Sequence, residues 1–195
     1  AALVEQEIQY LNEHFIITGY NLIINYARSY FEKLKRAVIS IISRLGLENG
    51  PCHLEMRHVN NEWKLVEINP RISGAGMNKL LSIGFGFNLV EETLKLALKE
   101  KFNISPRFTK NSFAEYVILE DKGILQRITG RAEVINSPGI EYTYVKPRRG
   151  TLLSPPTSLG NRYAYVIATG KSEEEAKENA KLAAKKIVFH IHKEP

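Results

Sequence analysis

The chain has 195 residues, of which 44% are hydrophobic, and its 27 basic and 21 acidic side chains give a net charge of +6. This length holds one domain, or one domain with an appendage, and no apolar run is long enough to span a membrane. The single cysteine, Cys52, excludes an internal disulfide framework and is typical of a reducing cytoplasm, where we expect the protein to work. The positive charge favours anions such as nucleotides, but no recognisable motif accompanies it, so we expect no nucleic-acid partner.

Residues 1–17 carry apolar side chains near helical spacing, which predicts a helix. The apolar positions are Leu3, Val4, Ile8, Leu11 and Phe15. The stretch opens without a start methionine and without a helix cap. We therefore expect the chain to begin inside a larger protein.

Residues 28–47 are predicted to form an amphipathic helix. The apolar stripe repeats at three- and four-residue spacing and consists of Phe31, Leu34, Val38, Ile41, Ile42 and Leu45. Gly46 and the pair Gly50–Pro51 end the helical pattern. We expect the stripe to pack against the apolar back of the segment that follows.

Two short alternating segments come next, and they predict a β-hairpin over residues 52–69. Asn60 and Asn61 lie between the segments and tolerate the left-handed backbone of a tight turn. One face of the hairpin is then polar and the other is apolar. The residues expected on the apolar, core-facing side are Leu54, Met56, Val66 and Ile68.

The polar face brings two carboxylates together. With the turn centred on Asn61, Glu55 lies directly opposite Glu67, and His53 lies opposite Asn69. Directly opposed Cβ atoms are about 4.5–5.5 Å apart, and two ionised carboxylates at that distance repel unless a cation lies between them. Mg²⁺ prefers oxygen ligands, so Glu55, Glu67 and Asn69 are candidate metal ligands. The alternative is a solvated hairpin face that carries a few charges.

Further polar residues extend the candidate site. His53 and Arg57 project from the same strand face as the first carboxylate and are candidates for substrate contact. Arg71 follows the second strand, and its guanidinium fork matches carboxylate or phosphate oxygens. The backbone amides near Ser73 and Gly74 are placed to meet a phosphate or a carboxylate, unless they only form a tight turn into a helix.

The rest of the chain is predicted to form a small antiparallel sheet with one covering helix. Before it, Asn88 caps a helix from Leu89 to about Lys101, and residues 103–111 form a linker. The segments with strand-like composition are residues 113–119, 131–135, 141–146 and 162–169.

A capping box, Ser172-Glu173-Glu174-Glu175, opens the final helix. The apolar line of that helix is Ala176, Ala180, Ala183, Ala184, Ile187 and Val188. His190 and His192 fall at its frayed end. Two residues apart on a helix, the histidines would not share a face, so we expect no metal site there.

The stretch from Gly50 to Gly74 resembles the metal-binding half of the ATP-grasp superfamily. Members carry an acidic residue on one strand, Glu-x-Asn on the next and an arginine after it, which here are Glu55, Glu67 with Asn69, and Arg71. The lead-in, Gly50-Pro51-Cys52-His53-Leu54-Glu55, looks most like the carboxylate–amine ligase branch, including the L-amino acid ligases. Residues 163–176 look like the C-terminal subdomain that follows the metal motif in biotin carboxylase and amino acid ligases.

The resemblance implies a fold and a set of ligands. The fold is α+β, the C-terminal half of an ATP-grasp fold, with residues 1–102 as the metal-binding part and residues 112–195 as a small antiparallel subdomain. Glu55 would hold one Mg²⁺ or Mn²⁺, Glu67 would bridge two, and Asn69 would complete the second. ATP would be the cosubstrate, and Arg71 would hold the acylphosphate or the substrate carboxylate.

The implied activity belongs to a longer protein. An ATP-grasp ligase phosphorylates a small-molecule carboxylate and lets an amine attack the acylphosphate, but this sequence contains no glycine-rich phosphate loop and no paired upstream lysines. We expect a fragment that lacks the N-terminal lobe and is inactive as an isolated chain. Apolar surface left uncovered by that lobe would promote a homo-oligomer. The alternative is a non-catalytic domain that binds metal or a partner protein.

Overall fold

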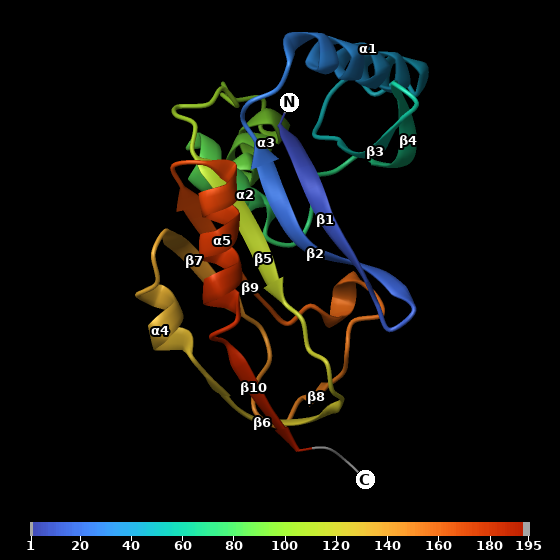
Figure 1. Ribbon diagram of the computed structural model, residues 1–195. Helices are drawn as coiled ribbons and strands as arrows, with labels where there is room; N and C mark the ends of the chain where they lie inside the picture. Colours follow the sequence, from blue (N-terminus) through green and yellow to red (C-terminus); the bar gives the residue numbers. More distant parts are fainter. Residues whose placement is uncertain (1, 193–195) are drawn as a thin grey trace. The chain divides into compact units, whose positions relative to one another are not determined.

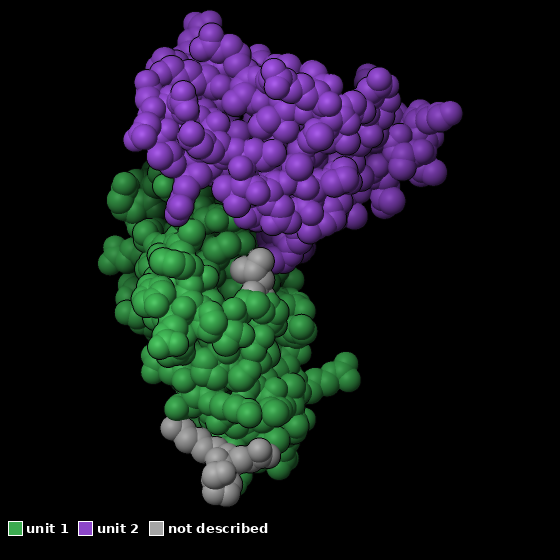
Figure 2. Space-filling view, turned by 90° about the vertical axis from the view of Figure 1, so that its right-hand side faces the viewer, with its two compact units in different colours: residues 1–23, 108–195 green, residues 24–107 purple. Residues whose placement is uncertain are grey.

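The computed structural model describes residues 2–192 (Figure 1). The chain divides into two compact units, which are coloured separately in Figure 2. The residues up to 23 and those from 108 onward make one unit, here called the sheet unit, and residues 24–107 make the other, here called the hairpin unit. Within residues 2–192 no helix is both long enough and apolar enough to cross a membrane.

A five-stranded antiparallel sheet forms the centre of the sheet unit. Its strands, in spatial order, are β1 (Leu3–Leu11), β2 (His14–Ile23), β5 (Asn111–Val117), β9 (Ala164–Gly170) and β7 (Ile140–Val145). The sheet therefore joins the start of the chain to strands from its second half. This mixed architecture of helices and antiparallel sheets confirms the predicted α+β fold class.

The predicted helix over residues 1–17 is wrong, because β1 and the start of β2 form a hairpin there. Asn12 and Glu13 have φ angles of 47° and 65°, the left-handed backbone of a tight turn. In β2 every second residue is buried, namely Ile16, Thr18, Tyr20 and Leu22. That two-residue period extends beyond the stretch that suggested a helix, and burial in the sheet overrides the local spacing.

Helix α5 (Glu173–Ala184) covers one face of this sheet. The predicted capping box is confirmed: Ser172 Oγ accepts a hydrogen bond from the Glu175 N–H at 3.2 Å, and Glu175 Oε2 accepts one from the Lys171 N–H at 2.6 Å. Four alanines of the predicted apolar line pack against the sheet, namely Ala176, Ala180, Ala183 and Ala184. Their small side chains let the helix approach the strands closely.

The opposite face of the sheet is rich in tyrosine. Tyr20, Tyr116 and Tyr165 are buried there, and their rings are in contact across β2, β5 and β9. Arg162 is buried with them: its Cζ lies 3.9 Å from the centre of the Tyr116 ring, and its Nη1 donates to the Ile17 carbonyl at 3.2 Å. The guanidinium thus replaces its lost hydration with a ring face and backbone oxygen.

A smaller three-stranded sheet completes the sheet unit. It consists of β10 (Val188–His192), β6 (Gly123–Thr129) and β8 (Leu152–Leu153), with α4 (Arg131–Ile135) and the 3₁₀ turn η1 (Leu159–Asn161) nearby in the chain. Residues 131–135, predicted to be a strand, form the helix α4. The strand β6, which precedes them, was not predicted. Gly130, with φ 88°, turns the chain between them, and a Cβ there would lie 1.7 Å from the Lys186 carbonyl oxygen.

The expected reading of the C-terminal histidines also needs correction. α5 ends at Ala184, and His190 and His192 lie on β10. Two residues apart on a strand, they share a face, contrary to the argument made for a helix. His190 Nε2 lies 2.9 Å from Thr129 Oγ1, and over residues 2–192 the structure contains no group of three or more His, Cys, Asp or Glu side chains placed to hold a metal.

The hairpin unit contains three helices and one hairpin. Its elements are α1 (Arg28–Arg44), β3 (His53–Val59), β4 (Glu62–Asn69), α2 (Met77–Phe85) and α3 (Leu89–Ala97). The predicted helix over residues 28–47 is confirmed, although only Leu34 of its stripe is fully buried. The Asn88 cap is also confirmed: its Oδ1 accepts from the Val90 N–H at 3.1 Å.

The compact units divide the chain differently from the domains expected at residues 1–102 and 112–195. The first 23 residues lie in the sheet unit because β2 pairs with β5, so Tyr20 opposes Ala114. The expected linker over residues 103–111 does contain the step from one unit to the other, at residues 107 and 108. The functional division stays a prediction.

A cluster of charges ties β1 to α5 in the sheet unit. Glu7 lies opposite Gly19, which lies opposite Glu115, so both carboxylates project from one face of the sheet. Lys177 and Lys181 from α5 form ion pairs with Glu7, and Lys181 Nζ lies 3.9 Å from Glu115 Oε1. Burial favours a raised pKa at Glu7, but hydrogen bonds from both lysines outweigh it and lower the pKa. Burial raises the pKa of Glu115 to about 7.

We predict that Glu115→Gln removes a pH dependence of folding. The unfolded chain releases this proton near pH 4.5 and the folded chain near 7, so the wild-type free energy of unfolding falls as pH rises between those values. The variant lacks this fall, so at pH 8 its free energy of unfolding should exceed that of the wild type by roughly 2 kcal/mol. Chemical denaturation followed by far-ultraviolet circular dichroism gives the free energy of unfolding of the two proteins at pH 5 and at pH 8.

Glu7→Gln is the matched control and has the opposite sign. The pKa of Glu7 is lowered in the fold, so its ionised form stabilises the protein above the unfolded pKa, and this contribution is lost as pH falls. The variant should be less stable than wild type at pH 8. A Glu115→Gln protein that is destabilised at pH 8, like Glu7→Gln, would contradict the assignment of Glu115.

Candidate metal centre on the β3–β4 hairpin

The β3–β4 turn consists of two residues. Asn60 and Asn61 have φ angles of 50° and 62°, and Val59 pairs with Glu62 across them. Paired asparagines suit this left-handed turn because they adopt positive φ at low cost. The turn is therefore centred between the two asparagines and not on Asn61, as expected from the sequence.

A β-bulge corrects the register between the turn and the carboxylates. Met56 pairs with Leu65, but the next pair along is Glu55 with Glu67, so Val66 is the extra residue on β4. The predicted pairs, Glu55 opposite Glu67 and His53 opposite Asn69, are thereby confirmed. The shifted turn centre alone would move the pairing by one residue, and the bulge moves it back, so the predicted pairs are kept at the candidate site.

The bulge also changes which residues share a face. The polar face carries the opposed pairs His53 with Asn69, Glu55 with Glu67, and Arg57 with Lys64. The apolar face carries Leu54 with Ile68, Met56 with Leu65, and His58 with Trp63. Val66, expected on the apolar face, is 66% exposed, and Leu65 takes its place. Lys64, expected on the apolar side, lies on the polar one and is solvated as predicted.

The oxygen donors on the polar face suit a hard divalent cation. Glu55 is half-buried, Glu67 is exposed, and Asn69 Nδ2 donates a hydrogen bond to Glu67 Oε1 at 2.8 Å. The opposed residue His53 has a buried Nδ1 with no hydrogen-bond partner. Two carboxylates and an amide thus lie on two neighbouring residue pairs of one face, although among residues 2–192 the side chains of His53, Glu55 and Glu67 do not converge into a three-ligand group. The donors fit Mg²⁺ or Mn²⁺ in type.

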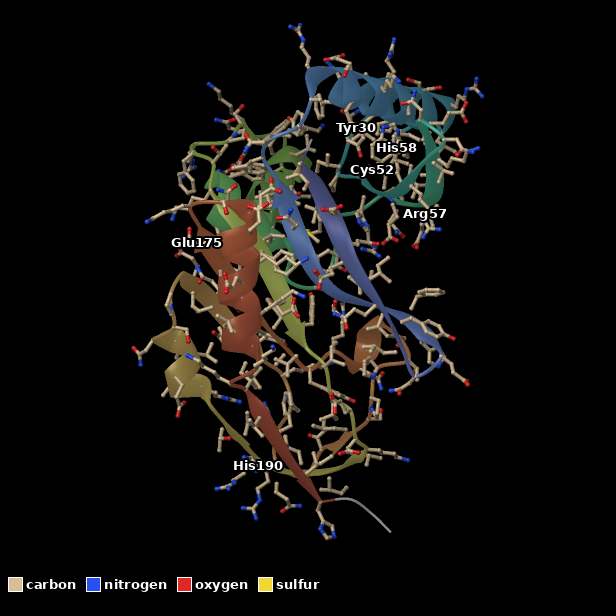
Figure 3. All side chains as sticks on the ribbon, in the orientation of Figure 1. Tyr30, Cys52, Arg57, His58, Glu175 and His190 are labelled. Atoms are coloured by element: carbon tan, nitrogen blue, oxygen red, sulfur yellow. The ribbon has the colours of Figure 1, made fainter. Side chains whose placement is uncertain are left out.

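The other predicted site residues lie further from this group. Arg57, labelled in Figure 3, is exposed. It opposes Lys64, so two cations lie on the turn side of the carboxylate pair. Arg71 is exposed, and its Nη1 donates to the neighbouring Ile72 carbonyl at 3.0 Å rather than to a carboxylate. Ser73 is half-buried, and Gly74 is exposed, with its carbonyl accepting from the first residue of α2 at 3.4 Å.

Sequence reasoning missed a ring cluster at the tip of the hairpin. Tyr30 of α1 contacts His58 of β3 and Trp63 of β4, with ring centres 5.2 and 5.0 Å apart. The available signal was the single tryptophan of the chain, placed two residues after the turn. Cys52 precedes β3 and is half-buried, and burial raises the pKa of its thiol.

Two family models match separate parts of the chain. An ATP-grasp domain matches residues 3–79, and the L-amino acid ligase C-terminal domain 2 matches residues 115–192. The first match includes the whole β3–β4 hairpin, and the second includes most of the sheet unit after β5 begins.

The chain belongs to the ATP-grasp superfamily.

Solved ATP-grasp ligases share the fold. Phosphoribosylglycinamide synthetase from Anaerococcus prevotii aligns with 97% of the chain at a TM-score of 0.82 and 18% identity. An L-amino acid ligase from Bacillus licheniformis aligns with 93% of it at a TM-score of 0.77 and 18% identity. At these identities the likeness concerns the fold alone.

A curated relative is similar over nearly the whole chain. The uncharacterised protein y4rH of Sinorhizobium fredii is 26% identical over 178 residues, which are 91% of this chain and 37% of y4rH. The two solved structures are likewise longer, and this chain covers 49% and 46% of them. The chain thus spans about half or less of the ATP-grasp relatives it matches.

We predict that Glu67→Gln weakens Mn²⁺ binding at least about tenfold, because it removes a charged oxygen ligand from the centre of the group. Glu62→Gln is the matched control. Glu62 lies on the same strand and face but opposes Val59 and pairs with Lys64 at 3.6 Å. Titration of the chain with Mn²⁺, followed by water-proton relaxation, gives both affinities. Equal weakening by the two variants would mean that only the overall charge attracts the metal.

Proposed function

We propose that this chain supplies the metal-binding and C-terminal parts of an ATP- and Mg²⁺-dependent carboxylate–amine ligase of the amino-acid type. The observation that carries the proposal is the direct opposition of Glu55 and Glu67, with the Asn69 amide bonded to Glu67. Membership of the ATP-grasp superfamily and the match to an L-amino acid ligase domain support it. A cytoplasmic location remains part of the proposal.

Four residues at the open end of the polar face have roles in this scheme. Glu55 and Glu67 would hold the divalent cations, and Asn69 orients the Glu67 carboxylate through its hydrogen bond. When bound, Mg²⁺ offsets the negative charge of the phosphoryl group that passes from ATP to the substrate carboxylate. His53, whose buried Nδ1 lacks a partner, is available to hydrogen-bond a substrate oxygen.

Cationic side chains would position the anionic substrate. Arg71 leaves its contact with the Ile72 carbonyl and binds the carboxylate or the acylphosphate through two parallel hydrogen bonds. Arg57, one residue pair beyond Glu55, adds positive charge along the same face. The backbone amides near Ser73 and Gly74 complete the anion contacts. An amine then attacks the acyl carbon of the acylphosphate and displaces phosphate.

The isolated chain should not turn over ATP. Phosphoryl transfer depends mainly on positioning, and the chain spans only 37% of y4rH and 46% of the solved L-amino acid ligase. The ATP-binding lobe would therefore come from the remainder of a longer protein. The alternative is a non-catalytic domain that keeps the metal site alone.

The deciding experiment measures ADP release with Mg²⁺ and a panel of amino acids. The 195-residue chain should release none. A longer protein that contains this chain and an ATP-binding lobe should release ADP in an amino-acid-dependent manner, and Glu67→Gln but not Glu62→Gln should abolish it. Metal binding without any amino-acid-dependent ADP release by the longer protein would favour the non-catalytic alternative. Amino-acid-dependent release by the chain alone would show that it is a complete ligase.

We predict that in the longer protein Arg71→Lys lowers kcat/KM far more than Lys64→Arg does. Lysine cannot reproduce the two parallel hydrogen bonds of a guanidinium, so a loss of about a hundredfold is expected. Lys64 is exposed and forms an ion pair with Glu62, so its replacement by another cation should change the rate little. Comparable losses in steady-state assays of the two variants would remove Arg71 from the site.

A further inference from the structure

The hairpin that carries the candidate ligands has little sheet to support it. Among the residues that the structure describes, β3 pairs only with β4, in a sheet of two strands. A two-stranded hairpin is marginally stable in water unless it packs against another element. The orientation of Glu55 and Glu67 must therefore be set by whatever holds the hairpin in place.

Helix α1 holds the tip of the hairpin. The rings of Tyr30, His58 and Trp63 form a closed triangle with centre-to-centre distances of 5.2, 5.0 and 5.0 Å. Lys33 Nζ donates a hydrogen bond to Asn61 Oδ1 in the turn at 3.0 Å. Figure 3 labels Tyr30 and His58 beneath α1. We call Tyr30, His58 and Trp63 the tip cluster.

The tip cluster lies apart from the main core of the hairpin unit. Tyr30 and Trp63 are half-buried and His58 is exposed. The fully buried apolar side chains of this unit are concentrated in and just after α2, and include Leu80, Leu81 and Phe85. Loosening the tip cluster should therefore leave that core folded.

Geometry connects the tip cluster to the carboxylates. Trp63 precedes Glu67 by four residues on β4, which at about 3.3 Å per residue places the ligands roughly 12 Å along the strand. His58 and Trp63 oppose each other on β3 and β4, so Tyr30 contacts both strands and limits how far they splay apart. A splay of about 10° from the tip would separate the two carboxylates by about 2 Å, whereas a metal site needs its ligands within about 0.5 Å. The bulge at Val66 lies between the two parts and adds a local bend and twist, so the strand is not a straight rod that fixes itself.

We propose that the tip cluster positions Glu55 and Glu67 for metal binding, so that Tyr30 of α1 is a positioning residue of the site. This inference rests on the proposed function of the polar face. It assigns α1 a role beyond packing: through Tyr30 the helix holds β3 and β4 at the separation that sets the spacing of the two carboxylates. The Lys33–Asn61 hydrogen bond reinforces the same contact from the edge.

The experiment uses Trp63, which is the only tryptophan of the chain, as a reporter of the tip cluster. Tyr30→Ala removes one ring of the triangle and Tyr30→Phe keeps it. Tyr10→Ala is the matched control, because Tyr10 also makes a 5.0 Å ring contact, with Phe15, but in the sheet unit. Each variant is titrated with Mn²⁺ alone, while tryptophan emission and far-ultraviolet circular dichroism are recorded.

We expect Tyr30→Ala to shift the Trp63 emission to the red, keep the circular dichroism of the wild type and raise the Kd for Mn²⁺ at least about threefold. Tyr30→Phe and Tyr10→Ala should keep the wild-type Kd within a factor of two. A red-shifted emission with an unchanged Kd would overturn the inference and leave the proposed function standing.

Two further outcomes are decisive. If the wild-type chain binds no Mn²⁺, or if Glu67→Gln binds it equally well, the proposed function fails and takes the inference with it. If Tyr30→Ala loses its secondary structure, Tyr30→Leu, which keeps apolar bulk, replaces it. An unchanged Kd in a folded Tyr30→Leu protein with shifted emission overturns the inference in the same way.

Discussion

The hairpin unit depends on one constraint, which is that Glu55 and Glu67 oppose each other across two strands. Two carboxylates so close repel, and the fold must either separate them or give them a partner. The Asn69 amide donates a hydrogen bond to Glu67 Oε1 and so offsets part of the negative charge of that carboxylate. The remaining oxygens face the polar side, where a divalent cation would satisfy both carboxylates. A slip of one residue would instead put a carboxylate on the apolar side.

A different arrangement of like charges occurs in the sheet unit. Glu7 and Glu115 also project from one face, but Gly19 lies between them and two lysines of α5 reach the pair. Phe113 fills the space that a side chain at Gly19 would need, since its Cζ lies 2.6 Å from a Cβ placed there. Here protein cations offset the carboxylates, and burial raises the pKa of Glu115 to about 7. This cluster therefore serves cohesion between strand and helix, whereas the hairpin pair remains open to an external cation.

The two units also differ in how their helices pack. α5 presents alanines to the sheet, and Ala176, Ala180 and Ala183 are completely buried. α1 presents larger apolar side chains, yet only Leu34 among them is buried. The helix contacts the tip of the hairpin through aromatic rings. A closely packed helix tolerates little movement. Because α1 contacts the hairpin more loosely, the loss of the single Tyr30 ring should alter the geometry of the hairpin.

Local patterns in the sequence predicted the elements that keep one period from end to end. The stripe from Phe31 to Ile42 gave α1, the capping box at Ser172 gave α5, and paired asparagines gave the hairpin turn. Patterns failed where packing overrode local spacing. The first strand pair was mistaken for a helix, and residues 131–135 were mistaken for a strand that proved to be a short helix.

The sequence by itself indicated a hairpin with Glu55, Glu67 and Asn69 on one face, and its prediction that Glu55 opposes Glu67 was confirmed although the assumed turn centre was wrong. Only the tertiary structure decided how that register arises, because a bulge at Val66 has no signature in the alternation of apolar and polar residues. It also decided that the first 23 residues join a sheet formed mostly after residue 108. Strand pairing between distant segments depends on long-range backbone hydrogen bonds and shared burial, and neither is encoded in the neighbours of any one residue.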